Sequence, residues 1–176
     1  FAYRSTDKAS KSSPAMRWVN PPVAWMMHAG IERIRKAGLS FPAHQKNFNP
    51  MQEQKNINKL MMGGCDYHNR LAFEVYPGLT VRVVSTKPYK NDNKNKDSLV
   101  RVMMRKNIVK HLRYGKAGLS TKLKSSLALQ NRMIMDYKGD YLDAAICALQ
   151  AAEVLKMRNF GLPKNLDTLE GWIGLS

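Results

Sequence analysis

The chain has 176 residues, a usual length for one domain and enough to bury a hydrophobic core. Its 29 Lys and Arg residues outnumber its 13 Asp and Glu residues, so the formal net charge is +16. This excess favours a polyanionic partner, first nucleic acid and second an anionic membrane surface, although basic composition also serves solubility alone. No stretch is apolar for long enough to cross a membrane, so we expect no membrane-spanning segment.

The N-terminal half of the chain predicts helices and one strand. Residues 1–20 are polar and indicate a loop with one short helix. Pro21-Pro22 and the apolar residues that follow at helical spacing predict a helix that Gly38 ends. Asn49-Pro50, as cap and first helical residue, predicts a second helix that runs to Gly63-Gly64. Residues 71–77 alternate apolar and polar side chains, which predicts a strand that Pro-Gly ends. The β-branched stretch 79–84 fits either a strand or the start of a helix.

Helices dominate the second half as well. With one clear strand and one or two possible ones, the whole pattern predicts an α/β protein whose sheet is incomplete. The expected elements in chain order are a basic loop at 87–96, a helix capped by Asp97 or Ser98 and closed by Gly115, a helix from Ser120, a short apolar strand at 132–137, and a helix from Asp140 that ends before Gly161.

The two cysteines, Cys65 and Cys147, lie far apart in the sequence. This pattern is typical of free thiols in a reducing compartment and predicts a cytoplasmic protein. Cys65 and His68 have a zinc-like spacing, but no second ligand pair accompanies them, so we do not expect a structural zinc.

Two aspartates open the last predicted helix, in the sequence GDYLDAAICALQAAE. Asp140 and Asp143 are one helical turn apart and share a face. The helix dipole, worth about 0.3–1 kcal/mol for each carboxylate, explains Asp140 well. It explains Asp143 less well, because apolar residues flank it and a buried carboxylate needs compensation. From spacing alone, a helix start and a magnesium site are equally supported.

Glu74 is a further candidate for chemistry. It lies on the polar face of the strand predicted at 71–77, and active sites of open α/β sheets gather at strand ends. From the residue pattern alone, an ordinary exposed glutamate on an edge strand is the favoured interpretation.

Four motifs in order carry a family resemblance: FEVYPG, KPYK, GDYLDAAICALQAA and EGWI. They resemble a family of predicted nucleases with the RNase H-like fold, long described as a domain of unknown function, over about residues 71–176. The opening FAYRSTDKA loosely resembles the Arg-x-x-Asp segment that precedes these motifs in the family. Asp140 and Asp143 also resemble the two aspartates that head the last helix of RuvC-type resolvases.

The resemblance implies a twisted sheet with helices on both faces and a carboxylate cluster that holds magnesium or manganese. In such sites, metal ions clamp the attacking and leaving oxygens of a phosphodiester while a metal-bound water attacks. Asp143 and Asp140 match the helix aspartates, and Glu74 matches the strand glutamate. These three carboxylates are therefore the predicted catalytic and metal-binding groups. Lys90 matches the lysine of the Tyr-Lys motif and is expected near a phosphate.

The chain departs from the family at its beginning. The family's first strand, which carries an aspartate near its end, and a later acidic strand would both precede Phe1. We therefore interpret residues 1–176 as one domain that is the C-terminal portion of an RNase H-like domain. One or two metal ligands and the central strands should be missing, and the chain as given should be inactive.

The positive charge is concentrated in the middle of the chain. Residues 87–124 hold 12 basic and 2 acidic side chains, whereas residues 125–176 hold 5 basic and 6 acidic ones. This contrast predicts a nucleic-acid-binding loop and helix at 87–116, with a solvated helix face as the alternative. Tyr89 and Tyr114 are candidates for stacking on bases. The predicted phosphate contacts are Lys87, Lys90, Arg101, Arg105, Lys106, Lys110 and Arg113.

The leading hypothesis is a metal-dependent nuclease of the RNase H-like type, incomplete in this chain. One alternative is a non-catalytic nucleic-acid-binding module on the same fold. Another is a protein-interaction subunit whose methionine-rich helices pack against a partner or a second copy. The residue patterns leave open DNA or RNA, the structure of the substrate and the oligomeric state.

Overall fold

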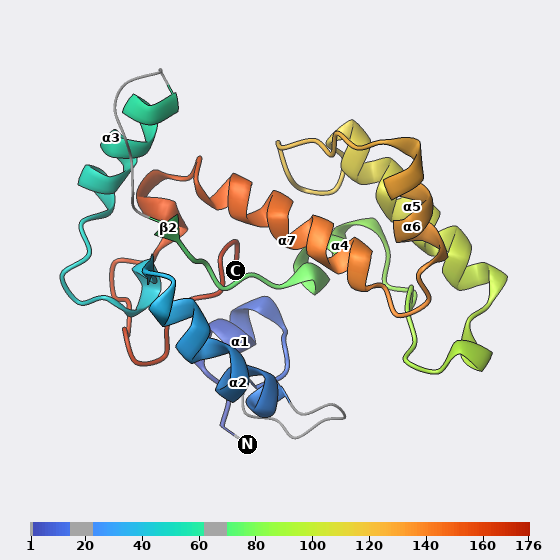
Figure 1. Cartoon of the computed structure of the whole chain (residues 1–176), viewed down its shortest axis with the longest axis horizontal. Helices are drawn as coiled ribbons and strands as arrows, with labels where there is room; N and C mark the ends of the chain where they lie inside the picture. Colours follow the sequence, from blue (N-terminus) through green and yellow to red (C-terminus); the bar gives the residue numbers. More distant parts are fainter. Residues whose placement is uncertain (1, 15–22, 62–69) are drawn as a thin grey trace. The chain divides into compact units, whose positions relative to one another are not determined.

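The computed structural model describes residues 2–14, 23–61 and 70–176. In this part of the chain, helices predominate and a two-stranded parallel sheet accompanies them (Figure 1). The predicted α/β class with a short sheet is therefore confirmed. Two compact units divide the chain: a terminal unit of Phe1–Glu74 and Leu155–Ser176, and a central unit of Val75–Val154. None of the helices over these described ranges has the length and apolar character needed to span a membrane.

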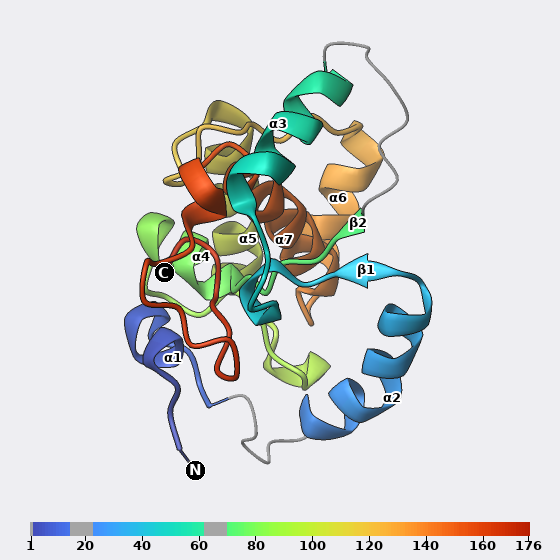
Figure 2. The same cartoon turned by 90° about the vertical axis from the view of Figure 1, so that its left-hand side faces the viewer.

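The elements of the terminal unit are α1 (Ser5–Ser10), α2 (Val23–Lys36), β1 (Leu39–Ser40), the 3-10 turn η1 (Pro42–His44), α3 (Pro50–Met61), β2 (Arg70–Leu71) and the 3-10 turn η3 (Arg158–Gly161). β1 and β2 lie side by side and parallel, with Leu39 opposite Arg70 (Figure 2). A separate parallel bridge joins Glu74 to Ile173 and brings the end of the chain to the segment after β2.

Phe160 anchors the apolar core of the terminal unit. Its side chain is fully buried, and its ring centroid lies 5.9 Å from that of Phe48 and 5.5 Å from that of Phe73. These contacts join η3 to segments that lie far from it in the sequence. Gln54 on α3 adds a hydrogen bond of 2.6 Å to the carbonyl of Leu155, so α3 and the C-terminal segment hold one another.

The elements of the central unit are α4 (Pro77–Val84), the 3-10 turn η2 (Lys94–Lys96), α5 (Leu99–Tyr114), α6 (Leu127–Met135) and α7 (Asp140–Val154). α7 packs against α4 and α6, and α5 packs against the same two helices (Figure 1). The side chains that fill the space between them are buried and apolar: Val81, Ile108, Leu112, Met133, Leu142 and Ile146.

Several helix predictions are confirmed with their caps. The Ser98 side chain accepts a hydrogen bond from the Arg101 N–H at the start of α5, and Gly115, with φ of 68°, closes that helix. α7 begins at Asp140 as predicted. α2 and α3 occupy the predicted places. The expected helix start at Pro21-Pro22, the expected helix end at Gly63-Gly64 and the Cys65–His68 pattern lie outside the described residues.

The strand predicted at 71–77 is much shorter in the structure. β2 covers only Arg70–Leu71, and beyond it Glu74 makes the single bridge to Ile173. The reason is that Pro77 does not end a strand but begins α4, with Tyr76 in the cap position before it. The ambiguous stretch 79–84 is accordingly helical.

Two predictions between α5 and α7 are wrong. No helix begins at Ser120, because its hydroxyl and the hydroxyl and N–H of Thr121 all donate to Oε2 of Glu153, at 2.7–3.0 Å. Burial opposes ionisation of Glu153, but these hydrogen bonds lower its pKa to about 2. The stretch 132–137 is not a strand, because most of it lies in α6, which Ser126 caps and which buries Gln130 and Met133 at helical spacing.

Arg105 lies inside the central unit, so the prediction that it binds phosphates is wrong. Its side chain is 0% exposed. The guanidinium donates to both oxygens of Asp97 at 2.9 and 3.0 Å, to the carbonyl of Tyr89 at 2.8 Å and to the carbonyl of Ile134 at 2.6 Å. The hydrogen bonds from Arg105 lower the pKa of Asp97, against the smaller effect of burial. This one side chain connects α5, the loop before it and the end of α6.

We predict that Arg105→Met lowers the free energy of unfolding by about 3–5 kcal/mol, because it leaves one carboxylate and two carbonyls without their buried donor. The neighbouring exposed Lys106 supplies a matched control, and Lys106→Met should stay within about 0.5 kcal/mol of the wild type. Urea denaturation followed by circular dichroism measures both. Equal midpoints for the two variants would contradict the role given to Arg105.

Candidate functional site

Asp143 on α7 is joined to two residues of the KPYK segment. The Tyr89 hydroxyl donates to its Oδ1 and the Lys90 ammonium donates to its Oδ2, each at 2.5 Å. The Asp143 side chain is 20% exposed and that of Lys90 is 44% exposed, so the ion pair lies at the edge of the fold. Two motifs separated by 53 positions in the sequence therefore meet at one carboxylate.

Gly139 allows this close approach. Its φ is 76°, in the left-handed region that glycine adopts without strain, and it directly precedes α7. A Cβ at this position would lie 3.0 Å from Cδ and 3.1 Å from Cβ of Lys90. The segment is held from the other side as well, because the Asn91 N–H donates to the Tyr137 carbonyl at 3.0 Å and Arg105 binds the Tyr89 carbonyl. The backbone around Lys90 is thus fixed at the start of α7.

Tyr89 binds Asp143 and is not accessible for stacking on a nucleic-acid base. Its side chain is only 9% exposed, so the prediction that it stacks on bases is wrong. Burial raises the pKa of Tyr89, and the hydrogen bond to Asp143 raises it further, so the hydroxyl keeps its proton and remains a donor. Tyr114, by contrast, is 57% exposed and accessible for stacking.

A hollow of about 290 Å³ borders Asp143 within the central unit, and we call it the Asp143 hollow. Three cationic side chains line it against the one carboxylate: Arg82, Lys87 and Lys90. Its wall also includes Gly78 in the first turn of α4, whose N-terminus favours anions. The charge and size of the Asp143 hollow suit a phosphate group.

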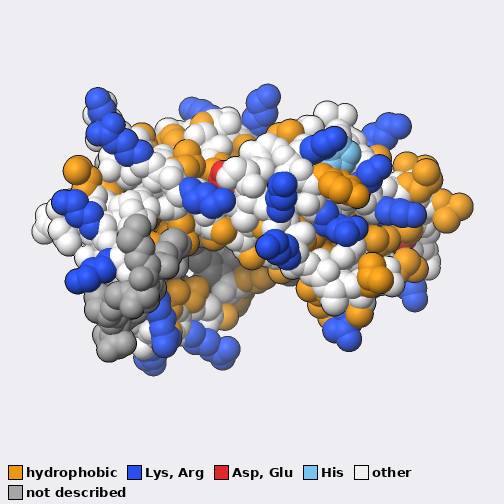
Figure 3. All heavy atoms as spheres, turned by 90° about the horizontal axis from the view of Figure 1, so that it is seen from above, with side chains coloured by type: hydrophobic (Ala, Val, Ile, Leu, Met, Phe, Trp, Pro, Cys, Tyr) orange, Lys and Arg blue, Asp and Glu red, His pale blue; other side chains and the backbone are white. Residues whose placement is uncertain are grey.

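The remaining predicted phosphate contacts differ in their surroundings. Lys106, Lys110 and Arg113 are exposed on α5, at positions that share one face of the helix. Arg101 is half-buried, and its guanidinium donates to the carbonyl of Lys96 in η2. Basic side chains (blue) are spread over the face shown in Figure 3, on which acidic side chains (red) are scarcely visible. This surface therefore favours an anionic partner.

The other two predicted carboxylates, Asp140 and Glu74, do not line the Asp143 hollow. Asp140 is the first residue of α7 and is exposed. Glu74 belongs to the terminal unit, whereas Asp140 and Asp143 belong to the central unit. Both carboxylate oxygens of Glu74 accept hydrogen bonds from the Arg4 guanidinium, at 2.6 and 2.8 Å. Glu74 is therefore half of a bidentate ion pair.

Arg4 is the centre of a second cluster, which lies in the terminal unit. Besides Glu74, its guanidinium binds the buried carboxylate of Asp7 at 2.8 Å and the carbonyl of Glu170 at 3.1 Å. Burial opposes ionisation of Asp7, but the hydrogen bonds and charge of Arg4 lower its pKa below the ordinary value. The Glu170 carboxylate in turn accepts from the N–H and hydroxyl of Ser5. The Arg-x-x-Asp, FEVYPG and EGWI motifs thus meet here.

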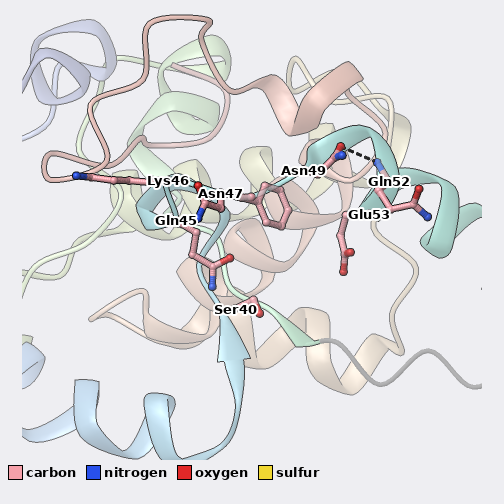
Figure 4. Close-up of a pocket in the computed structure, with 8 residues that line it drawn as sticks. Ser40, Gln45, Lys46, Asn47, Asn49, Gln52 and Glu53 are labelled. Carbon is pink, nitrogen blue, oxygen red and sulfur yellow. Dashed lines mark hydrogen bonds between the residues drawn. The ribbon is translucent and has the colours of Figure 1, made fainter.

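The terminal unit also contains a hollow of about 470 Å³ (Figure 4). None of the predicted site residues lines it. The Asn49 side chain accepts a hydrogen bond from the Gln52 N–H at 3.1 Å and so caps α3. Amide side chains make up much of the lining of this hollow: Gln45, Asn47, Asn49 and Gln52.

The predicted carboxylates do not form a complete set of metal ligands, but Asp143 fits a metal site of one kind. Among residues 2–14, 23–61 and 70–176, no three His, Cys, Asp or Glu side chains are grouped so as to hold a metal ion. Magnesium, however, is commonly held by one or two carboxylates, with water and substrate phosphates completing its coordination. Asp143, at the edge of a hollow that suits phosphate, fits that kind of site. A cation at its Oδ2 would compete with Lys90.

No protein-family model, curated protein or solved structure matches the chain. The resemblance to RNase H-like nucleases therefore stays a prediction. Sequence reasoning named Lys90, Asp143 and Glu74. It missed the hydrogen bond of Tyr89 to Asp143 and the pairing of Arg4 with Glu74 and Asp7. The only signal for Arg4 and Asp7 was the loose Arg-x-x-Asp match, and for Tyr89 it was its place beside Lys90.

We predict that Tyr89→Phe lowers the free energy of unfolding by about 1–2 kcal/mol. Hydrogen bonds to charged groups contribute about 1.5–3 kcal/mol, and the lower figure reflects the partial exposure of Asp143 and its remaining bond to Lys90. Tyr114→Phe, on the exposed side of α5, is the control and should change stability by less than about 0.5 kcal/mol. Equal losses in a urea titration would show that the Tyr89 hydroxyl contributes nothing.

Proposed function

We propose that the protein is a metal-dependent nuclease of the RNase H-like type, acts in the cytoplasm and binds nucleic acid through its central unit. The observation that carries this proposal is the contact of Tyr89 and Lys90 with Asp143. Two motifs of the resemblance share this carboxylate, and a hollow suited to phosphate lies beside it. The other motifs of the resemblance also touch one another, around Arg4 in the terminal unit.

Each charged group of the Asp143 hollow has a role in this proposal. Arg82, Lys87 and Lys90 hold phosphate oxygens of the backbone. Asp143 holds a magnesium or manganese ion, and Asp140, one turn earlier on α7, is a further proposed ligand. When bound, the metal supplies Lewis-acid polarisation of the phosphodiester and an activated water.

A non-catalytic nucleic-acid-binding module is the second candidate, and a specific observation favours it. Asp143 and Glu74 each have a cationic partner within the chain, Lys90 and Arg4. Such partners compensate the carboxylates without a metal ion. The two candidates share nucleic-acid binding and differ in cleavage alone.

We predict that the protein cleaves labelled single-stranded DNA or RNA when manganese is present. Asp143→Asn should reduce that cleavage at least about 100-fold. Mutating a residue that only supports a metal ligand already costs up to about 100-fold in activity, and Asp143 is itself the proposed ligand. Asp92→Asn, in the exposed basic loop, is the charge-matched control and should cleave at the wild-type rate. Binding without manganese-dependent cleavage would favour the binding module, and absence of binding would overturn both candidates.

We predict that nucleic-acid binding weakens steeply with salt, with a log-log slope of roughly −0.9 for each phosphate neutralised on duplex DNA. Changing Lys106, Lys110 and Arg113 to glutamate should reduce the magnitude of the slope by roughly 1 for each phosphate that is no longer neutralised. The matched control makes the same change in charge on α2, at the exposed Arg33, Arg35 and Lys36. If both triple variants lose affinity and slope equally, binding follows total charge rather than the face of α5.

A further inference from the structure

We infer that Lys90 is an exchangeable counter-ion of Asp143. It neutralises the carboxylate until a phosphate group binds in the Asp143 hollow and then turns to that phosphate, so that phosphate binding and divalent-metal binding at Asp143 favour one another. This inference rests on the proposed function, because it assumes that Asp143 holds a metal ion and that the Asp143 hollow receives a phosphate.

The position of Lys90 makes this exchange possible. Its stem is held where its Cβ and Cδ lie against Gly139, while the side chain as a whole is 44% exposed. A lysine ammonium is a point charge on a flexible stem and has no fixed geometry to satisfy. The same side chain lines the Asp143 hollow, so its ammonium reaches Asp143 and a ligand of the hollow from one fixed backbone position.

The two partners of Asp143 differ in how readily they leave. Tyr89 is a buried residue, and Arg105 holds its backbone, so the bond of its hydroxyl to Oδ1 is part of the fold. The Lys90 ion pair is partly exposed, and such pairs contribute little net free energy. Departure of the Lys90 ammonium therefore frees Oδ2 while Tyr89 keeps the carboxylate in place.

The charges explain why phosphate and metal would bind together. A phosphate in the hollow attracts Lys90 and leaves Asp143 without its counter-ion, next to a second negative charge. A divalent cation held by Asp143 would offset this repulsion. Because coupling between two ligands is reciprocal, the phosphate raises the affinity for metal by the same factor as the metal raises the affinity for phosphate.

The test measures manganese affinity by calorimetry in the full chain, with and without thymidine monophosphate as the phosphate probe. Without the probe, Lys90→Met should bind manganese about two- to fivefold more tightly than the wild type, the range expected for loss of a partly exposed ion pair. With the probe, the wild type should gain about fivefold or more in manganese affinity, and Lys90→Met should gain distinctly less. Lys94→Met, in η2, removes the same charge and should match the wild type in both conditions.

The outcomes separate this inference from the proposed function. If Asp143→Asn loses manganese binding but Lys90→Met binds manganese like the wild type, the exchange is wrong and the metal site stands. If Asp143→Asn binds manganese as well as the wild type does, the metal role of Asp143 fails, and the proposed function fails with it. Lys90→Gln, which keeps a hydrogen-bond donor without the charge, serves if Lys90→Met does not fold. Weaker manganese binding in the Lys90 variant would show that lysine supports the site and would overturn the inference.

Discussion

The buried guanidinium of Arg105 is the interaction on which the central unit and its site depend. A buried charge is tolerated only when it is paired and hydrogen-bonded, and Arg105 meets this condition with Asp97 and two backbone carbonyls. One of these carbonyls belongs to Tyr89, whose hydroxyl holds Asp143. The core of the unit is thereby connected to the carboxylate at its edge through one residue.

Each unit contains carboxylates that are paired with a basic side chain of the same unit. Asp143 has Lys90 in the central unit, and Glu74 and Asp7 share Arg4 in the terminal unit. The pairs differ in geometry for a physical reason. The planar guanidinium of Arg4 donates two parallel hydrogen bonds to Glu74. Lys90 contacts Asp143 through a single ammonium group on a flexible stem. This difference in geometry is why we infer exchange with an outside ligand at Asp143 and not at Glu74.

Local signals predicted the elements that local chemistry decides. Ser98 and Gly115 mark the ends of α5, and the glycine before Asp140 marks the start of α7, because caps and left-handed glycines act within a few residues. The same approach failed at Ser120, because the groups that hold its segment lie on Glu153, 33 positions away. The strand predicted at 71–77 failed similarly, since a strand needs a partner that its own sequence does not reveal.

The sequence by itself determined the charge of the protein, its helical character and the residue types available for chemistry, including Lys90 and Asp143. Only the tertiary structure decided which basic residues face solvent. Arg105 and Lys106 are neighbours on one helix with similar charge, yet one is buried and the other exposed. The structure also decided which cation meets which carboxylate. Burial and pairing depend on residues brought together by folding, and distance along the chain carries no information about such contacts.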